Sequence, residues 1–116
     1  MTTVAQGLTD VLAAFARGDL TAAAAGFVED ATYREARKPA ICGRAAVAAH
    51  FARLRGSGAT WAFAVDDVIA DRDRACVVYR FTVAGGDGKG RLERAGCALV
   101  RLDERGHIAE WREYEG

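Results

Sequence analysis

Three short segments of the sequence place an ionisable side chain beside an aromatic or apolar one. Glu113 lies two residues from Trp111 in the closing segment HIAEWREYE, and Glu35 lies two residues from Tyr33 in ATYREAR. Because strand side chains alternate between two faces, each pair shares one face if its segment is a strand. Arg80 stands in the apolar run ACVVYRFTVA, where a guanidinium on a covered face needs a partner.

These residue types are suited to acid–base chemistry on a small molecule. A carboxyl group beside an indole loses hydration, which raises its pKa, whereas a neighbouring guanidinium acts in the opposite direction. A general acid or base works best when its pKa lies near the working pH. We therefore expect a pocket in which Glu113 is the acid or base, Arg80 orients it and Tyr33 binds a substrate oxygen.

The predicted pocket also needs walls, because small-molecule sites are concave, mostly apolar and carry few polar groups. The further residues expected to bind the substrate are Glu35 near the mouth, Trp61, Phe63, Val78, Thr82 and Trp111. Two alternatives remain open. Arg80 and Glu113 could form a purely structural ion pair. A one-residue shift of the last strand would bring Arg112 to the pocket in place of Glu113.

The elements that would position these residues follow from the hydrophobic pattern. Apolar residues recur at three- and four-residue spacing between positions 8 and 15, which predicts a first helix. Gly18 ends it, and Asp19 caps a second, short helix whose apolar face includes Phe27. A short strand follows over 31–37, and a third helix runs from about Gly43 to 56–58.

The second half of the chain reads as four long strands. They cover 60–70, 75–84, 94–102 and 107–115, with short polar turns and a glycine-rich hairpin loop at 85–90 between them. Such an order predicts an antiparallel meander. We therefore expect an α+β fold, with three N-terminal helices packed on one face of a strongly curved antiparallel sheet.

The outer face of this sheet is expected to be covered by a second copy of the chain. The large groups that we place there are Val77, Tyr79, Phe81, Leu99, Arg112 and Tyr114. So many large side chains are unusual on a surface that faces water. We therefore expect a homodimer.

Length and composition narrow the classes of function. The 116 residues predict a single domain, 1–116. Lys plus Arg and Asp plus Glu each number 16, so no basic excess favours nucleic acid or an anionic membrane as partner. The three cysteines and two distant histidines have no metal-site or disulfide spacing. The sequence shows no signal peptide and no apolar run long enough to span a membrane, so we expect a cytoplasmic protein. We also expect no cofactor and no metal.

The segment AFARGDLTAAAAGFVEDATYREARKPAICGRAAVAAHF (14–51) and the ending HIAEWREYE carry a resemblance to a known family. They resemble the SnoaL-like branch of the nuclear-transport-factor-like superfamily, which includes polyketide cyclases, ketosteroid isomerases, scytalone dehydratase and limonene epoxide hydrolase. The resemblance implies a cystatin-like α+β cone with a deep internal pocket, and commonly a homodimer through the outer sheet face. The fold hosts many chemistries, so it does not fix the reaction.

The epoxide-hydrolase branch gives the nearest motif match, and the match is incomplete. Tyr33 and Arg80 correspond to a Tyr and an Arg of that branch, and Glu113 in WREY stands at the Asp of its WRDY. Glu35 replaces an Asn, and Thr82 replaces the second Asp of the acid–base pair. Hydrolysis by that mechanism would require Glu35 to supply the second carboxylate.

Three classes of function follow from these patterns. The first is a cofactor-independent enzyme that hydrates, isomerises or cyclises a small apolar molecule with an oxygen function. The second is a binding protein that has lost the family's acid–base pair, which Thr82 favours. The third is a dimeric interaction module, which predicts a cone filled by its own side chains.

Overall fold

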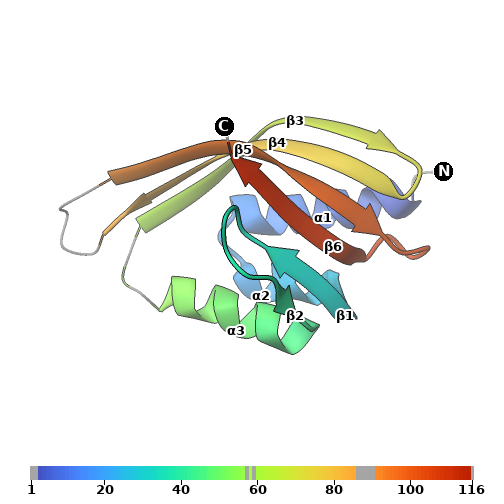
Figure 1. Cartoon of the computed structure of the whole chain (residues 1–116), viewed down its shortest axis with the longest axis horizontal. Coiled ribbons are helices and arrows are strands. Elements are labelled where there is room, and N and C mark those ends of the chain that lie inside the picture. Colours follow the sequence, from blue (N-terminus) through green and yellow to red (C-terminus); the bar gives the residue numbers. More distant parts are fainter. Residues whose placement is uncertain (1–2, 57, 59, 86–90, 116) are drawn as a thin grey trace.

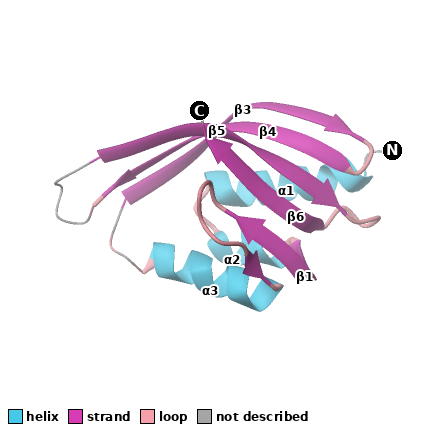
Figure 2. Ribbon diagram, viewed as in Figure 1, coloured by secondary structure: helices cyan, strands magenta, loops and turns pink. Residues whose placement is uncertain are grey.

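Three helices lie against one face of a curved six-stranded sheet in the computed structural model, which describes residues 3–56, 58, 60–85 and 91–115 (Figures 1 and 2). The elements are α1 (Thr3–Ala16), α2 (Leu20–Ala25), β1 (Phe27–Arg34), β2 (Ile41–Cys42), α3 (Arg44–Arg55), β3 (Thr60–Asp71), β4 (Arg74–Ala84), β5 (Arg91–Leu102) and β6 (Ile108–Glu115). The predicted α+β class with three N-terminal helices is confirmed. Most of the predicted glycine loop, 86–90, lies outside the described residues.

The strands are ordered β2-β1-β6-β5-β4-β3, and all neighbours are antiparallel except β1 and β6, which run parallel. The meander from β3 to β6 therefore follows the prediction, whereas β1 adds to it from a distant part of the chain. The register pairs Tyr33 with Trp111. Because the two strands run in the same direction, Glu35 and Glu113, each two residues further on, project from neighbouring positions.

The helices present an apolar face to the sheet. Leu8 and Val11 of α1 and Val47 of α3 are buried. Asp19 caps α2 by accepting a hydrogen bond from the Ala22 backbone N–H at 3.0 Å. In the described part of the chain, no helix has the combination of length and apolarity that crossing a bilayer requires.

The second helix ends earlier than predicted. Gly26 caps α2, and Phe27 begins β1 instead of continuing the helix. Gly26 packs so closely on the Val11 side chain that a Cβ atom at this position would overlap it. The helical spacing of Phe27 was misleading, because Phe27 is apolar as the buried first residue of β1 and not as part of the apolar face of α2.

The inner face of β4 is the opposite of the predicted one. Val77 and Tyr79 are buried under the helices at 0% and 2% exposure, whereas Arg80 is exposed on the outer face. The tight turn pairs Asp71 with Arg74, and an unbroken hairpin would then pair Phe63 with Thr82. A bulge between Val65 and Asp67 shifts the register by one residue, so Phe63 pairs with Phe81 instead.

Three of the six large residues predicted on the outer face therefore lie on the inner face. Val77, Tyr79 and Phe81 lie inside because pairing through β5 puts them on the same face of the sheet as Trp111 of β6. Leu99 and Tyr114 do lie outside and are 45% and 46% exposed. Arg112 sits between them in the sheet, paired with Leu99 and stacked over the Tyr114 ring at 5.9 Å.

Candidate functional site

A cavity of about 350 Å³ lies between the helices and the inner face of the sheet. Its apolar lining is Phe15, Leu20, Phe51, Leu54, Trp61, Phe63, Phe81, Val83, Leu92 and Trp111. Its polar lining is Tyr33, Glu35, Lys38, His50, Arg53, Tyr79, Arg94, Glu113 and Glu115. The volume and the apolar walls are typical of a small-molecule site.

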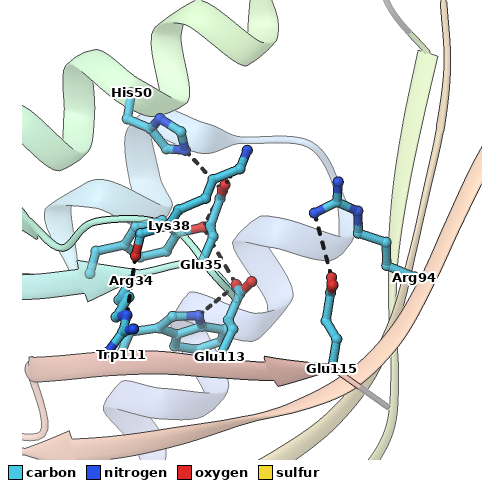
Figure 3. Close-up of polar contacts among 9 residues, drawn as sticks. Arg34, Glu35, Lys38, His50, Arg94, Trp111, Glu113 and Glu115 are labelled. Atoms are coloured by element: carbon cyan, nitrogen blue, oxygen red, sulfur yellow. Dashed lines mark hydrogen bonds and ion pairs between the residues drawn. The ribbon is translucent and has the colours of Figure 1, made fainter.

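Glu113 is a largely buried carboxyl group of this cavity, and its contacts are mainly with neutral donors. The Trp111 indole Nε1–H, on the same face of β6, donates a hydrogen bond to Glu113 Oε2 at 2.9 Å (Figure 3). The Tyr33 hydroxyl lies 3.5 Å from the same oxygen. No ion pair of Glu113 occurs among the described residues, so its charge has no cationic partner there.

Burial raises the pKa of Glu113 from its ordinary value of 4.5 to about 7. The hydrogen bond from Trp111 opposes this shift, and the negative charge of Glu35 adds to it. A carboxyl group with a pKa near neutrality can both give and take a proton under physiological conditions.

Glu35 is the second carboxyl group of the site and is surrounded by donors. Its Oε2 accepts a hydrogen bond from the Tyr33 hydroxyl at 3.1 Å and lies 2.9 Å from Nε2 of His50. Its Oε1 lies 3.4 Å from Nζ of Lys38 (Figure 3). Burial alone would raise the pKa of Glu35, but the hydrogen bond and charge of His50, together with Lys38, outweigh it and lower the pKa.

Two tyrosine hydroxyls face the carboxyl groups. Burial, followed by the charges of Glu113 and Glu35, holds the pKa of Tyr33 well above its ordinary value of 10. Burial and the charge of Glu113 likewise raise the pKa of Tyr79, so both hydroxyls keep their protons. The buried Tyr79 hydroxyl makes no well-formed hydrogen bond within the described part of the protein, although it lies close to Glu113.

Six of the nine predicted site residues line the cavity, and three do not. The six are Tyr33, Glu35, Trp61, Phe63, Trp111 and Glu113, which also settles the register of β6 in favour of Glu113 over Arg112. Arg80, Val78 and Thr82 belong to the outer face of β4, because strand pairing aligns Ala75 of β4 with Val100 of β5 and Trp111 of β6, and so places the alternate residues Ala75, Val77 and Tyr79 on the inner face.

Arg80 has a partner on the outer face instead of Glu113. Its Nη2 donates to Asp66 Oδ1 at 2.9 Å, and its Nε lies 3.0 Å from Oδ2 of the same carboxylate. Asp66 is the residue at the bulge. Arg80 and Thr82 were expected to stand at the catalytic Arg and Asp of the epoxide-hydrolase branch. They do not line the cavity, so this expectation is wrong.

His50 and Tyr79 belong to the site although neither was predicted to do so. The position of His50 beside the buried Phe51 on α3 indicates a partly buried histidine, but only the fold brings it to Glu35. Tyr79 was missed because β4 was placed the wrong way round. Among the described residues, no group of three or more His, Cys, Asp or Glu side chains is arranged to hold a metal ion.

Comparison with known proteins places the chain in a family. Residues 8–111 match the model of the SnoaL-like domain. The structure is similar to an M. tuberculosis LEH-like epoxide hydrolase, with a TM-score of 0.83 and 20% identity over 99% of this chain and 84% of that one. It is also similar to Bal32a from a soil-derived mobile gene cassette, with a TM-score of 0.82 and 26% identity over 97% and 88% of the two chains.

An NTF2-like protein of unknown function from Burkholderia pseudomallei K96243 has the same fold, with a TM-score of 0.83 and 17% identity over 100% of this chain and 92% of that one. A search of curated proteins gave no significant match. The family model covers nearly the whole chain, and these structures share its overall fold. The chain therefore belongs to the SnoaL-like family and has the nuclear-transport-factor-like cone fold.

Proposed function

We propose that the protein is a small-molecule enzyme that uses its own side chains for acid–base chemistry. Its substrate is a small, largely apolar molecule with an oxygen function, and its reaction is a hydration, isomerisation or cyclisation. One observation carries the proposal: Glu113 and Glu35 line the same cavity, and their environments shift their pKa values in opposite directions. Such a separation is typical of acid–base pairs in active sites.

Glu113 is the acid and base of this proposal. Near neutral pH it is divided between its two protonation states, so it can donate a proton to a substrate oxygen or accept one from carbon or water. Glu35 stays ionised and accepts the hydrogen bond of the Tyr33 hydroxyl at 3.1 Å. Arg80 has no part in this mechanism because it lies on the outer face.

Tyr79 is the group that we assign to the substrate oxygen. A hydroxyl has a single proton, and that of Tyr33 is donated to Glu35. The Tyr79 hydroxyl lies in the cavity wall close to Glu113, where a hydrogen bond between them lowers the pKa of Glu113, but its geometry is not well formed. A weakly paired buried donor is costly, so a ligand oxygen placed beside Glu113 would gain the Tyr79 proton. We keep Tyr33 as the hydrogen-bonded link between the two carboxyl groups.

The second candidate function is ligand binding without turnover. It is favoured by the position of Arg80, since the arginine expected from the epoxide-hydrolase branch does not reach the cavity. The interaction module with a filled cone is disfavoured by the open volume of about 350 Å³.

The experiment that tests the proposal compares the wild-type chain with Glu113→Gln on panels of epoxides, enones and lactones. We expect turnover of one panel to fall by roughly 10²–10⁴-fold, since this is the usual contribution of a positioned acid or base. Glu110→Gln is the matched control, because Glu110 lies on the same strand but pairs with Arg101 outside the cavity. Binding without turnover in the wild-type chain would favour the second candidate, and equal rates in both variants would contradict the role of Glu113.

We also propose that the chain forms a homodimer through the outer face of the sheet. Ile69, Leu99 and Tyr114 are exposed there at 63%, 45% and 46%. Strand pairing brings Ile69 and Leu99 to either side of Cys76, and Tyr114 lies next to Cys97. No other element of the described chain covers this face (Figure 1). Large exposed apolar side chains on an uncovered sheet face favour association.

A further inference from the structure

His50 occupies a position in the site that the proposed chemistry leaves unused. It lies on α3 and lines the cavity, and its ring packs against Tyr33 with 5.6 Å between ring centroids. Its Nε2 is 2.9 Å from Glu35 Oε2. The two side chains are only 26% and 23% exposed, so water screens their interaction less than it would screen a surface pair.

The same oxygen of Glu35 holds both His50 and Tyr33. Tyr33 donates to Oε2 at 3.1 Å, and the distance from its hydroxyl to Glu113 Oε2 is 3.5 Å. These two acceptors compete for one proton, and the shorter distance gives it to Glu35. Lys38 contacts the other oxygen of Glu35, at 3.4 Å, and its side chain is 56% exposed. His50 is therefore the partner that fixes the Glu35 oxygen to which the Tyr33 hydroxyl donates.

We propose that His50 is a positioning residue that anchors Glu35 so that the Tyr33 hydroxyl is bound by Glu35 and kept from Glu113. This inference rests on the proposed function, because it explains what leaves Glu113 available as the acid and base. Without His50, the Glu35 side chain is free to turn toward Lys38 and the cavity mouth. The Tyr33 hydroxyl then donates to Glu113 and stabilises its ionised form.

The charged and titratable groups around the two carboxyl groups define what else acts on them. Glu35 is faced by Tyr33 from β1, Lys38 from the following loop, His50 from α3 and Glu113 from β6. Glu113 is faced by Glu35, by Tyr79 from β4 and by Glu115 from its own strand. Of these groups, only Tyr33 contacts both carboxyl groups by hydrogen bonding.

The test is a pH titration of the full chain, followed by carboxyl-carbon NMR signals of Glu35 and Glu113. In His50→Ala we expect the pKa of Glu35 to rise by roughly one pH unit and that of Glu113 to fall by a similar amount. His107→Ala is the control, because His107 follows the turn before β6 and lies outside the cavity. Loss of folding would be detected from the thermal transition.

A double-mutant cycle separates positioning from a structural role. If His50 acts through Tyr33, His50→Ala will no longer lower the pKa of Glu113 in a Tyr33→Phe background. A Glu113 pKa that does not change in His50→Ala, or that changes equally with and without the Tyr33 hydroxyl, would overturn the inference. His50→Gln keeps a neutral donor and should give a smaller change in the same direction, which preserves the test if the alanine variant does not fold.

The wild-type titration distinguishes this inference from the proposed function. If Glu113 titrates near its ordinary value of 4.5 in the wild-type chain, the proposed function fails. The dependence of Glu35 on His50 is still measured in that case, from the Glu35 signal alone.

Discussion

Glu113 and Glu35 show how two identical carboxyl groups acquire different properties within one cavity. Glu113 is surrounded by an indole and two phenols, so burial is not offset by a cation. Glu35 is closer to the Tyr33 hydroxyl than Glu113 is, and it also contacts His50 and Lys38. The difference is therefore made by α3 and by the loop after β1, which bring His50 and Lys38 to Glu35 and no such partner to Glu113.

At the residue scale, the raised pKa of Glu113 predicts a pH dependence of stability. Its folded pKa of about 7 lies above its ordinary value of 4.5, so the folded state holds this proton more tightly than the unfolded state. Its contribution to stability is fully present below pH 4.5 and is lost as the pH rises to about 7. The loss amounts to at most about 3.5 kcal/mol, since the two pKa values differ by about 2.5 and a pKa difference of one corresponds to about 1.4 kcal/mol.

Urea denaturation near pH 5 and near pH 8 measures this effect, since these two pH values span roughly the range in which the contribution of Glu113 is lost. Glu113→Gln removes the titrating group, so the difference in unfolding free energy between the two pH values should shrink relative to the wild-type chain. Glu110→Gln should leave that difference unchanged. An equal pH dependence in the wild-type chain and in Glu113→Gln would show that Glu113 does not titrate in this range.

At the scale of elements, the contact of β5 with β6 positions the carboxyl wall of the cavity. Gly96 on β5 faces Glu115 of β6, and a Cβ atom at Gly96 would overlap the backbone oxygen of Tyr114. Backbone atoms cannot move aside as a flexible side chain can. Close approach of the two strands at this point therefore requires glycine.

Gly96→Ala should separate these strands near the site. We expect a loss of about 1–3 kcal/mol in unfolding free energy, which is the usual cost of overpacking. Gly56→Ala is the control, because a Cβ atom there meets its nearest neighbour, the Ala52 oxygen, at 3.4 Å. Chemical denaturation of both variants measures the effect, and equal stability of Gly96→Ala and the wild-type chain would refute the close approach.

Local pattern predicted the elements well but could not orient all of them. The helix spacing and the meander from β3 to β6 follow from hydrophobic periodicity, as does the shared face of Trp111 and Glu113. The facing of Arg80 does not, because both faces of β4 are largely apolar and only its pairing through β5 with β6 decides which face is the inner one. The contact of His50 with Glu35 depends on how α3 packs on β1, which no local spacing encodes.

At the scale of the whole molecule, the two faces of the sheet have separate roles. The inner face carries the cavity, and its charged groups come from the loop after β1, from α3, and from β5 and β6. The outer face carries the Arg80–Asp66 pair together with Ile69, Leu99 and Tyr114. Because Arg112 and Tyr114 alternate with Glu113 along β6, association through the outer face would hold the same strand that bears the acid–base group.

This arrangement predicts that dimerisation can be removed without removing the cavity. Leu99→Glu places a carboxylate on the outer face, and burial against a second copy would remove its hydration at a cost that the neighbouring Arg112 offsets only in part. We expect the wild-type chain to sediment as a dimer and Leu99→Glu as a folded monomer that keeps the raised Glu113 pKa. Ala45→Glu, on the exposed side of α3, adds the same charge away from this face and should remain dimeric. A wild-type monomer, or a dimer unaffected by Leu99→Glu, would exclude the outer face as the interface.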